Sequence, residues 1–293
     1  MVTAVVLSGG GSLGAVQVGM LLALSDRDVT PDLLVGSSVG ALNAAFMAGH
    51  PAASGAQQLA RTWTKLRRSD VFPTDVTRLL RAAAGRTSGL ADPKSLRALV
   101  QSNLTYPRLQ DAPVRLAVVS TDVLAGQEVV LCDGATVDAV MASAALPGVF
   151  PPVRLGERLL MDGGVVNNTP ISVAHRLGAD TIYVLPTGYA CALSEPPRSP
   201  LGMAIHAVTI AIQQRLIADV TALQGTIDLR VAPPLCPLSV SPIDFRHTAG
   251  LIDRARAATG AWLDRPISAD QARDLAMHSH PSEHAHAESR GSL

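Results

Sequence analysis

The chain has 293 residues, of which 47% are hydrophobic, so it can bury a large core and fits a single α/β domain over residues 1–277. Aromatic residues make up only 3%, which leaves mainly Ala, Val and Leu to build the core and suits helices packed closely on a sheet. The 24 basic and 24 acidic residues cancel, and this balance argues against a nucleic-acid partner.

The cysteine pattern indicates a reducing compartment. Cys132, Cys191 and Cys236 are odd in number and far apart, without C-x-x-C spacing, so we expect neither a disulfide framework nor a zinc site. No basic residues precede the N-terminal apolar run, which argues against a signal peptide. The longest uncharged run, Leu33 to Ala60, is rich in Gly, Ser and Asn and predicts a buried segment, not a membrane span. We therefore expect a cytoplasmic protein.

The first predicted element is a buried strand at Val2–Leu7, which a glycine-rich loop, Gly9–Gly14, joins to an apolar helix. Such a loop at a helix start presents unpaired N–H groups to negative charge. The loop also fits the dinucleotide pattern G-x-G-x-x-G, which requires an acidic residue at the end of the second strand. Here Asp32 precedes that strand, Leu33–Val35. The pattern therefore favours a loop that stabilises an oxyanion over a loop that binds a nucleotide.

The second strand runs into Gly36-Ser37-Ser38-Val39-Gly40, which matches the G-x-S-x-G pattern. Small flanking residues let the backbone take a strained strand-to-helix turn that exposes the serine hydroxyl. The pattern predicts Ser38 as a nucleophile, with a turn that carries no catalytic function as the alternative.

Basic side chains concentrate in residues 57–89, where the spacing predicts two amphipathic helices. Leu59, Trp63 and Leu66 share the apolar face of the first helix, and Arg61 and Lys65 lie on the other face. We interpret the basic faces as solvated, with peripheral membrane contact as the alternative.

Further along, the patterns predict a hairpin of strands, Val114–Ser120 and Glu128–Leu131, and then a helix, Val137–Ala145. A short strand, Arg158–Met161, leads into Asp162-Gly163-Gly164. A carboxylate between an apolar strand and two glycines is well placed to reach a site crowded with backbone, and a turn aspartate is the alternative.

The last part of the chain completes the sheet. We expect strands at Thr181–Leu185 and Thr226–Val231 and helices at Leu201–Leu223 and Ala249–Leu263. Residues 278–293 form a His-rich tail whose composition predicts disorder, with metal binding by its histidines left open.

Four motifs, in the same order, resemble those of the patatin-like phospholipases. They are Gly9 to Gly14, Gly36 to Gly40, Ala142 to Pro147 with Phe150-Pro151-Pro152, and Asp162-Gly163-Gly164 with Asn168-x-Pro170. The resemblance covers residues 2–186 and implies a three-layer α/β/α fold with a mostly parallel central sheet, as in bacterial patatin-like acyl hydrolases.

The resemblance also implies the roles of individual residues. In that family the elbow serine is the nucleophile, the aspartate of the D-G-[GA] motif is its only partner, and the glycine-rich loop forms the oxyanion hole. By position, the catalytic residues would be Ser38 and Asp162. The oxyanion hole would be formed by the backbone of Gly9, Gly10, Gly11, Ser12 and Gly14. The elbow would be supported by Gly36, Val39 and Gly40, and the aspartate by Gly163 and Gly164.

One position departs from the family pattern. The family usually carries Arg or Lys just before the last glycine of the loop, where this chain has Leu13. A basic side chain there can pair with a phosphate, so its absence favours simple acyl esters over diacyl phospholipid as substrates.

The implied activity is that of a serine acyl hydrolase of phospholipase A, lysophospholipase or esterase type, with a lipid or other ester as substrate. Ser38 would attack the ester carbonyl, and Asp162 would activate the water that hydrolyses the acyl-enzyme, with no metal and no cofactor. The alternatives are acyl transfer by the same dyad, and a lipid- or nucleotide-binding module with an inactive elbow. A Ser-His-Asp triad would have to use His247.

Overall fold

The computed structural model describes residues 1–51, 53–73, 89–188, 196–236, 238 and 240–275. The predicted tail at residues 278–293 lies outside these ranges, so its disorder and metal binding stay predictions. The single-domain assignment of residues 1–277 also stays a prediction.

One eight-stranded sheet forms the centre of the protein, in the order β5-β6-β3-β2-β1-β7-β8, with β4 paired to β3. The strands are β1 (Thr3–Leu7), β2 (Leu33–Ser37), β3 (Arg115–Asp122), β4 (Glu128–Leu131), β5 (Val153–Leu155), β6 (Arg158–Asp162), β7 (Thr181–Leu185) and β8 (Asp228–Val231). β3, β2, β1, β7 and β8 run parallel, whereas β4, β5 and β6 add antiparallel pairs. The predicted mostly parallel sheet and the β3–β4 hairpin are confirmed.

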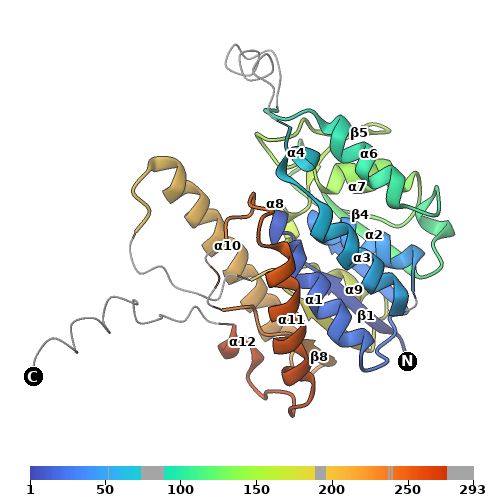
Figure 1. The fold of residues 1–293 in the computed structure, drawn as a ribbon, viewed down its shortest axis with the longest axis vertical. Helices are drawn as coiled ribbons and strands as arrows, with labels where there is room; N and C mark the ends of the chain where they lie inside the picture. The colour runs from blue at the N-terminus through green and yellow to red at the C-terminus, as the bar shows by residue number, and fades with distance from the viewer. Residues whose placement is uncertain (52, 74–88, 189–195, 237, 239, 276–293) are drawn as a thin grey trace, which may run out of the picture.

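Helices cover both faces of the sheet. One face carries α1 (Gly14–Ser25), α2 (Val39–Gly49), α3 (Ala53–Lys65), α6 (Pro93–Asn103), α7 (Thr136–Ser143) and α11 (Thr248–Leu263). The other face carries α9 (Ile171–Arg176), α10 (Pro200–Leu223) and α12 (Gln271–Asp274). Short helical segments are η1 (Gly11–Leu13), α4 (Arg68–Val71), η2 (Leu109–Asp111) and α8 (Gly164–Asn167). Figure 1 shows this arrangement, in which α1 and α11 pack side by side. The predicted three-layer α/β/α architecture is confirmed.

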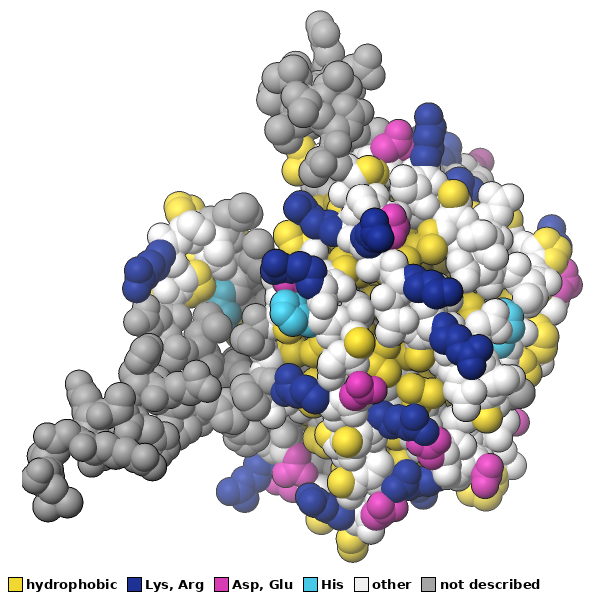
Figure 2. Space-filling model, viewed as in Figure 1, with side chains coloured by type: hydrophobic (Ala, Val, Ile, Leu, Met, Phe, Trp, Pro, Cys, Tyr) yellow, Lys and Arg dark blue, Asp and Glu magenta, His cyan; other side chains and the backbone are white. Residues whose placement is uncertain are grey.

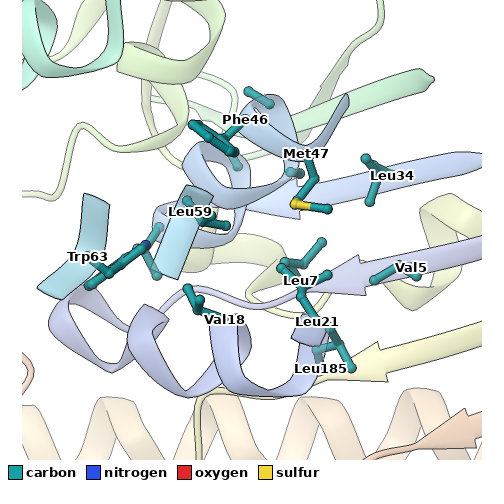
Figure 3. Packing of buried hydrophobic residues seen from close by; sticks show 14 of the residues in the cluster. Val5, Leu7, Val18, Leu21, Leu34, Phe46, Met47, Leu59, Trp63 and Leu185 are labelled. Atoms are coloured by element: carbon teal, nitrogen blue, oxygen red, sulfur yellow. The ribbon is translucent and has the colours of Figure 1, made fainter. Parts of the chain in front are cut away.

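The strands bury both of their faces, as the continuous apolar runs predict. Along β1, Val5 and Leu7 join the hydrophobic cluster under α1 and α2, whereas Ala4 and Val6 join the cluster under α9 and α10. Figure 3 shows the first cluster, in which Leu7 lies among aliphatic side chains of β2, β7 and the covering helices. The core is mainly aliphatic, as the low aromatic content requires.

Several elements differ from the sequence-based expectations. The helix after the glycine-rich loop begins as the 3-10 turn η1, and only from Gly14 is it an α-helix. The strand predicted to end at Met161 continues to Asp162, because that residue still pairs with β3. The short elements β5 and α12 were not expected.

The surface carries charges of both signs. Figure 2 shows basic and acidic side chains interspersed on the viewed face. Helix α3 has the predicted amphipathic form, with Leu59 and Trp63 buried and Arg61 and Lys65 exposed. Most of the predicted second helix lies in residues 74–88, outside the described residues, and membrane contact through this region stays a prediction. No helix within the described ranges combines the length and apolar character that a membrane crossing needs.

One expectation about the cysteines is wrong. Cys132 is a free and exposed thiol, but Cys236 is disulfide-bonded. The odd cysteine count and wide sequence spacing do not reveal which segments the fold brings together, and spacing alone therefore missed this bond.

Candidate active site

Ser38 occupies the turn between β2 and α2, at the carboxyl end of the parallel strands. Its backbone has φ 55° and ψ −126°, and it shares a positive φ only with Asp28 among the described non-glycine residues. Such a conformation stores strain, of order 1–3 kcal/mol, and is typical of functional turns. Gly40 permits the turn, since a Cβ atom there would overlap the carbonyl oxygen of Leu7. Gly36 at the end of β2 and Val39 at the start of α2 complete the predicted elbow.

Asp162 reaches Ser38 through strand pairing. Ser37 on β2 pairs with Val119 on β3, and the next residue of β3, Ser120, pairs with Asp162 on β6. This register places the carboxylate beside the elbow, where the Ser38 hydroxyl donates to Asp162 Oδ2 over 2.6 Å. The fold therefore joins two residues that are 124 positions apart.

The Asp162 carboxylate is almost entirely buried, with 2% of the residue exposed. Burial penalises the charged form and raises the pKa of Asp162 to about 6, although hydrogen bonds from Ser38 and the Gly164 N–H oppose this shift. The Gly164 N–H donates to Asp162 Oδ1 over 2.7 Å, and the first glycine, Gly163, packs against the Val119 carbonyl. The carboxylate is thus a stronger base than an ordinary aspartate while remaining mostly ionised at neutral pH.

The glycine-rich loop lies against Ser38. A Cβ atom on Gly9 would come 2.3 Å from Asn168 Oδ1 and 3.0 Å from Ser38 Cβ, so a larger residue there would displace one of these side chains. Several loop amides already donate to backbone carbonyl groups. The Gly9 N–H donates to Asn168, the Ser12 N–H to Pro242, the Leu13 N–H to Gly10, and the Gly14 N–H to Gly11 and Ser12. The amides of Gly10 and Gly11 donate to no acceptor within the described ranges.

Distant segments hold the loop in place. Thr187, just after β7, donates its hydroxyl to the Gly9 carbonyl over 2.7 Å, and the Asn168 side chain donates to the same oxygen over 3.4 Å. On the other side of the loop, the Ser12 hydroxyl donates to the Ser241 carbonyl over 3.0 Å. The loop is therefore fixed by residues far from it in sequence.

A buried amide network supports the base of the loop. The Gln17 amide donates to the carbonyls of Ser8 and Leu185, which lie at the ends of β1 and β7. Asn43 donates to Gln17 and to the Gly14 carbonyl, and it accepts from the Trp63 ring N–H. Both amides use all their donors, and a fully satisfied buried network of this kind is rigid.

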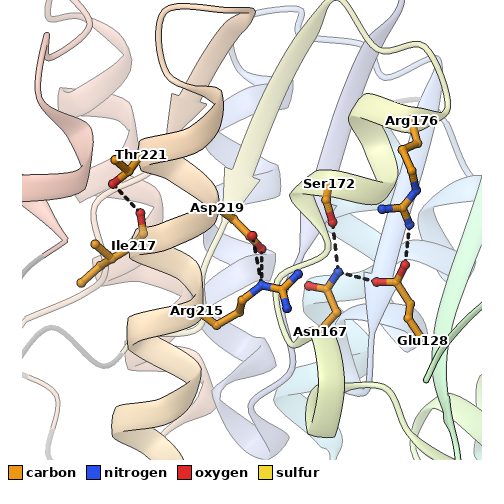
Figure 4. Close-up of polar contacts among 8 residues, drawn as sticks. All are labelled: Glu128, Asn167, Ser172, Arg176, Arg215, Ile217, Asp219 and Thr221. Carbon is orange, nitrogen blue, oxygen red and sulfur yellow. Dashed lines mark hydrogen bonds and ion pairs between the residues drawn. The ribbon is translucent and has the colours of Figure 1, made fainter. Parts of the chain in front are cut away.

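The segment after Asp162 is anchored to β4. The side-chain amide of Asn167, at the end of α8, donates to Glu128 over 2.5 Å and to Ser172 over 3.3 Å. Arg176 forms an ion pair with the same glutamate. Figure 4 shows Asn167 and Arg176 converging on Glu128. These contacts hold the turn that follows the aspartate.

Two other sequence-predicted positions lie apart from the Ser38–Asp162 contact. His247 precedes α11 with its side chain 56% exposed, 3.4 Å from Asp244. No histidine of the described residues hydrogen-bonds Ser38, so the geometry favours a dyad over a triad. Leu13, which replaces the family's basic residue, is buried in the hydrophobic core.

Sequence reasoning named no role for Thr187 or Ser143. Thr187 lies two residues after the parallel strand β7, a position where functional residues gather, so its placement was a usable signal. Ser143 lies in a recognised motif, but its contacts depend on how α7 packs on the sheet.

The comparisons with known sequences point to one family. A family model described as patatin-like phospholipase matches residues 5–175, more than half of the chain. Patatin-like phospholipase domain-containing protein 6 of Homo sapiens is 34% identical over 187 residues, which are 63% of this chain and 13% of that protein. An uncharacterized NTE family protein of Mycobacterium tuberculosis is 33% identical over an alignment of 282 residues, and the match covers 88% of this chain and 46% of that protein. The chain thus spans less than half the length of both relatives.

Among solved structures, VipD from Legionella pneumophila is similar with a TM-score of 0.48 and 15% identity, over 90% of this chain and 66% of that one. Human GIVD cytosolic phospholipase A2, in complex with methyl gamma-linolenyl fluorophosphonate, gives a TM-score of 0.44 and 14% identity, over 94% of this chain and 59% of that one. The family model, which covers more than half of the sequence, decides the assignment, and the chain belongs to the patatin-like phospholipase family.

Proposed function

We propose that the chain is a serine acyl hydrolase that cleaves carboxylic esters of lipids with Ser38 as nucleophile and Asp162 as its base. The observation that carries the proposal is the 2.6 Å hydrogen bond between the hydroxyl of a strained elbow serine and a buried carboxylate. Membership in the patatin-like phospholipase family supports lipid hydrolase activity.

In the first half of the reaction, Ser38 Oγ attacks the carbonyl carbon of the ester while its proton moves to Asp162 Oδ2. The raised pKa of Asp162 brings the carboxylate closer to the basicity that this transfer needs. The tetrahedral intermediate then collapses, the bond to the alcohol breaks, and the alcohol leaves with the proton from Asp162. Ser38 is left as an acyl-enzyme.

The oxyanion of the tetrahedral intermediate needs hydrogen-bond donors beside Ser38. We assign this role to the N–H groups of Gly10 and Gly11, because the other amides predicted for the oxyanion hole, those of Gly9, Ser12 and Gly14, already donate to carbonyl groups. The amino-terminal end of α2 begins directly after Ser38, and its dipole favours negative charge at the same place.

In the second half, a water molecule gives its proton to Asp162 and attacks the acyl-enzyme, and the proton returns to Ser38 as the fatty acid leaves. The same carboxylate thus serves as base in both halves. Because Leu13 lies in the core where the family carries a basic side chain, we expect simple esters to be cleaved faster than diacyl phospholipid.

A fluorophosphonate probe tests the proposal, since it reacts with an activated serine. We expect the wild-type chain to be labelled and to hydrolyse p-nitrophenyl esters, and Ser38→Ala to lose both, with at least a 10³-fold drop in turnover, roughly the loss seen when an activated nucleophile is removed. Ser120→Ala is the control, because it makes the same serine-to-alanine change on the neighbouring strand β3, where the Ser120 hydroxyl makes no hydrogen bond within the described ranges. Labelling that persists in Ser38→Ala would disprove the assignment.

A further inference from the structure

The motif from Ala142 to Pro147 has no part in the chemistry described so far, yet residues of this motif hydrogen-bond both Ser38 and Asp162. Helix α7 ends at Ser143 and packs on β3 and β6, the strands that flank the elbow and carry Asp162. The contacts at the end of this helix therefore bear on the geometry of the site.

The Ser143 side chain is fully buried and forms two hydrogen bonds. Its hydroxyl oxygen accepts the backbone N–H of Ser38 over 2.9 Å, and its hydroxyl hydrogen goes to the Val119 carbonyl over 2.5 Å. A hydroxyl group has one hydrogen to donate, so its orientation is fixed and its oxygen is left to accept from Ser38.

The backbone of the same segment contacts the acid side of the dyad. The Ser143 carbonyl accepts the Gly163 N–H over 3.3 Å, and the Ala145 carbonyl accepts the Asp162 N–H over 3.0 Å. A segment of three residues thus accepts hydrogen bonds from the nucleophile, from the acid and from the glycine that follows the acid.

We infer that Ser143 is a positioning residue that holds the strained backbone of Ser38 in register with Asp162. The inference rests on the proposed function and adds to it a residue that sets the distance between nucleophile and base. The geometry requires such a partner because Ser38 has a positive φ and precedes the helix, so no helical hydrogen bond takes its N–H group.

Loss of the Ser143 hydroxyl would leave the Ser38 N–H without its acceptor. The strained turn would then relax to a conformation that satisfies this donor, and Ser38 Oγ would move relative to Asp162 and to the loop amides. A shift of about 1 Å in a reacting group can cost about a hundredfold in rate. We therefore expect Ser143→Ala to react about ten to a hundred times more slowly.

The experiment compares Ser143→Ala with Ser120→Ala by the rate and the final extent of fluorophosphonate labelling. Both serines are fully buried and both changes remove one oxygen atom, but the Ser120 hydroxyl makes no hydrogen bond within the described ranges. We expect Ser143→Ala to be labelled slowly but to completion, with a lower kcat and an almost unchanged KM, and Ser120→Ala to match the wild type. A purely structural defect would lower the final extent of labelling instead.

Ser143→Cys keeps the shape of the side chain, with a slightly larger atom in place of the oxygen, and offers only a weak acceptor, so we expect a rate between those of the wild type and Ser143→Ala. Equal labelling rates for the wild type, Ser143→Ala and Ser143→Cys would overturn the inference. The dyad would still stand if labelling depends on Ser38. Labelling that persists in Ser38→Ala would instead overturn the proposed function, and this inference with it.

Discussion

The turn that carries Ser38 is formed by consecutive residues, with the distant Ser143 accepting its N–H, whereas the position of Asp162 depends on pairing between segments far apart in the chain. Ser38 lies between β2 and α2, and small neighbours permit its turn. Asp162 depends on antiparallel pairing of β6 with β3 and on carbonyls at the end of α7. The two sides of the site should therefore respond differently to mutation. Substitutions near Ser38 should act by crowding the backbone of the turn, and substitutions at Asp162 should act by changing its charge.

The largest expected effect comes from removing the charge of Asp162. Asp162→Asn keeps the shape of the side chain and an acceptor for the Gly164 N–H but cannot take the Ser38 proton. We expect turnover to fall by about 10²- to 10⁴-fold, as is typical for loss of a general base, while the circular dichroism spectrum is retained. Steady-state hydrolysis of a p-nitrophenyl ester measures this, and near-normal rates would assign the base role to another group.

Burial of the same carboxylate predicts a pH dependence of both rate and stability. Because the ionised form acts as base and the pKa of Asp162 is about 6, kcat/KM should be constant above about pH 7 and fall about tenfold per pH unit below 6. The raised pKa also means that the folded state holds this proton more tightly than the unfolded state, so wild-type stability decreases between about pH 4 and pH 6 and then levels off.

Asp162→Asn removes this titration and serves as its control. We expect Asp162→Asn to be more stable than the wild type by on the order of 3 kcal/mol at pH 8 and to show almost no difference at pH 4. Urea unfolding at the two pH values measures the free energies of unfolding. A wild type that is as stable as Asp162→Asn at pH 8 would show that burial does not penalise the carboxylate.

The smallest expected effect comes from crowding the backbone beside the Ser38 turn. Gly40→Ala places a Cβ atom against the Leu7 carbonyl, and we expect it to lower the free energy of unfolding by about 1–3 kcal/mol, as overpacking does. Gly250→Ala in α11 is the matched control, because its Cβ would meet no atom within 4 Å and alanine favours helix by about 1 kcal/mol. Urea unfolding of both variants measures the difference, and equal effects would contradict the close approach at Gly40.

Much of the architecture could be predicted because it depends on local patterns. The apolar run of β1, the hairpin of β3 and β4, and the long helix α10 each show a local pattern in the sequence, and the structure confirms them. The bond at Cys236 and the contacts of Thr187 could not be predicted, because both depend on segments that meet only after folding.

The sequence by itself determined the family, the layered α/β class and the two residues on which the proposed chemistry depends, since glycine spacing and strand periodicity are local properties. The tertiary structure alone decided that Asp162 lies 2.6 Å from Ser38, that burial raises its pKa to about 6, and that Ser143 accepts the Ser38 N–H. Distances and desolvation arise from strand register and helix packing, which bring together residues that no local pattern connects.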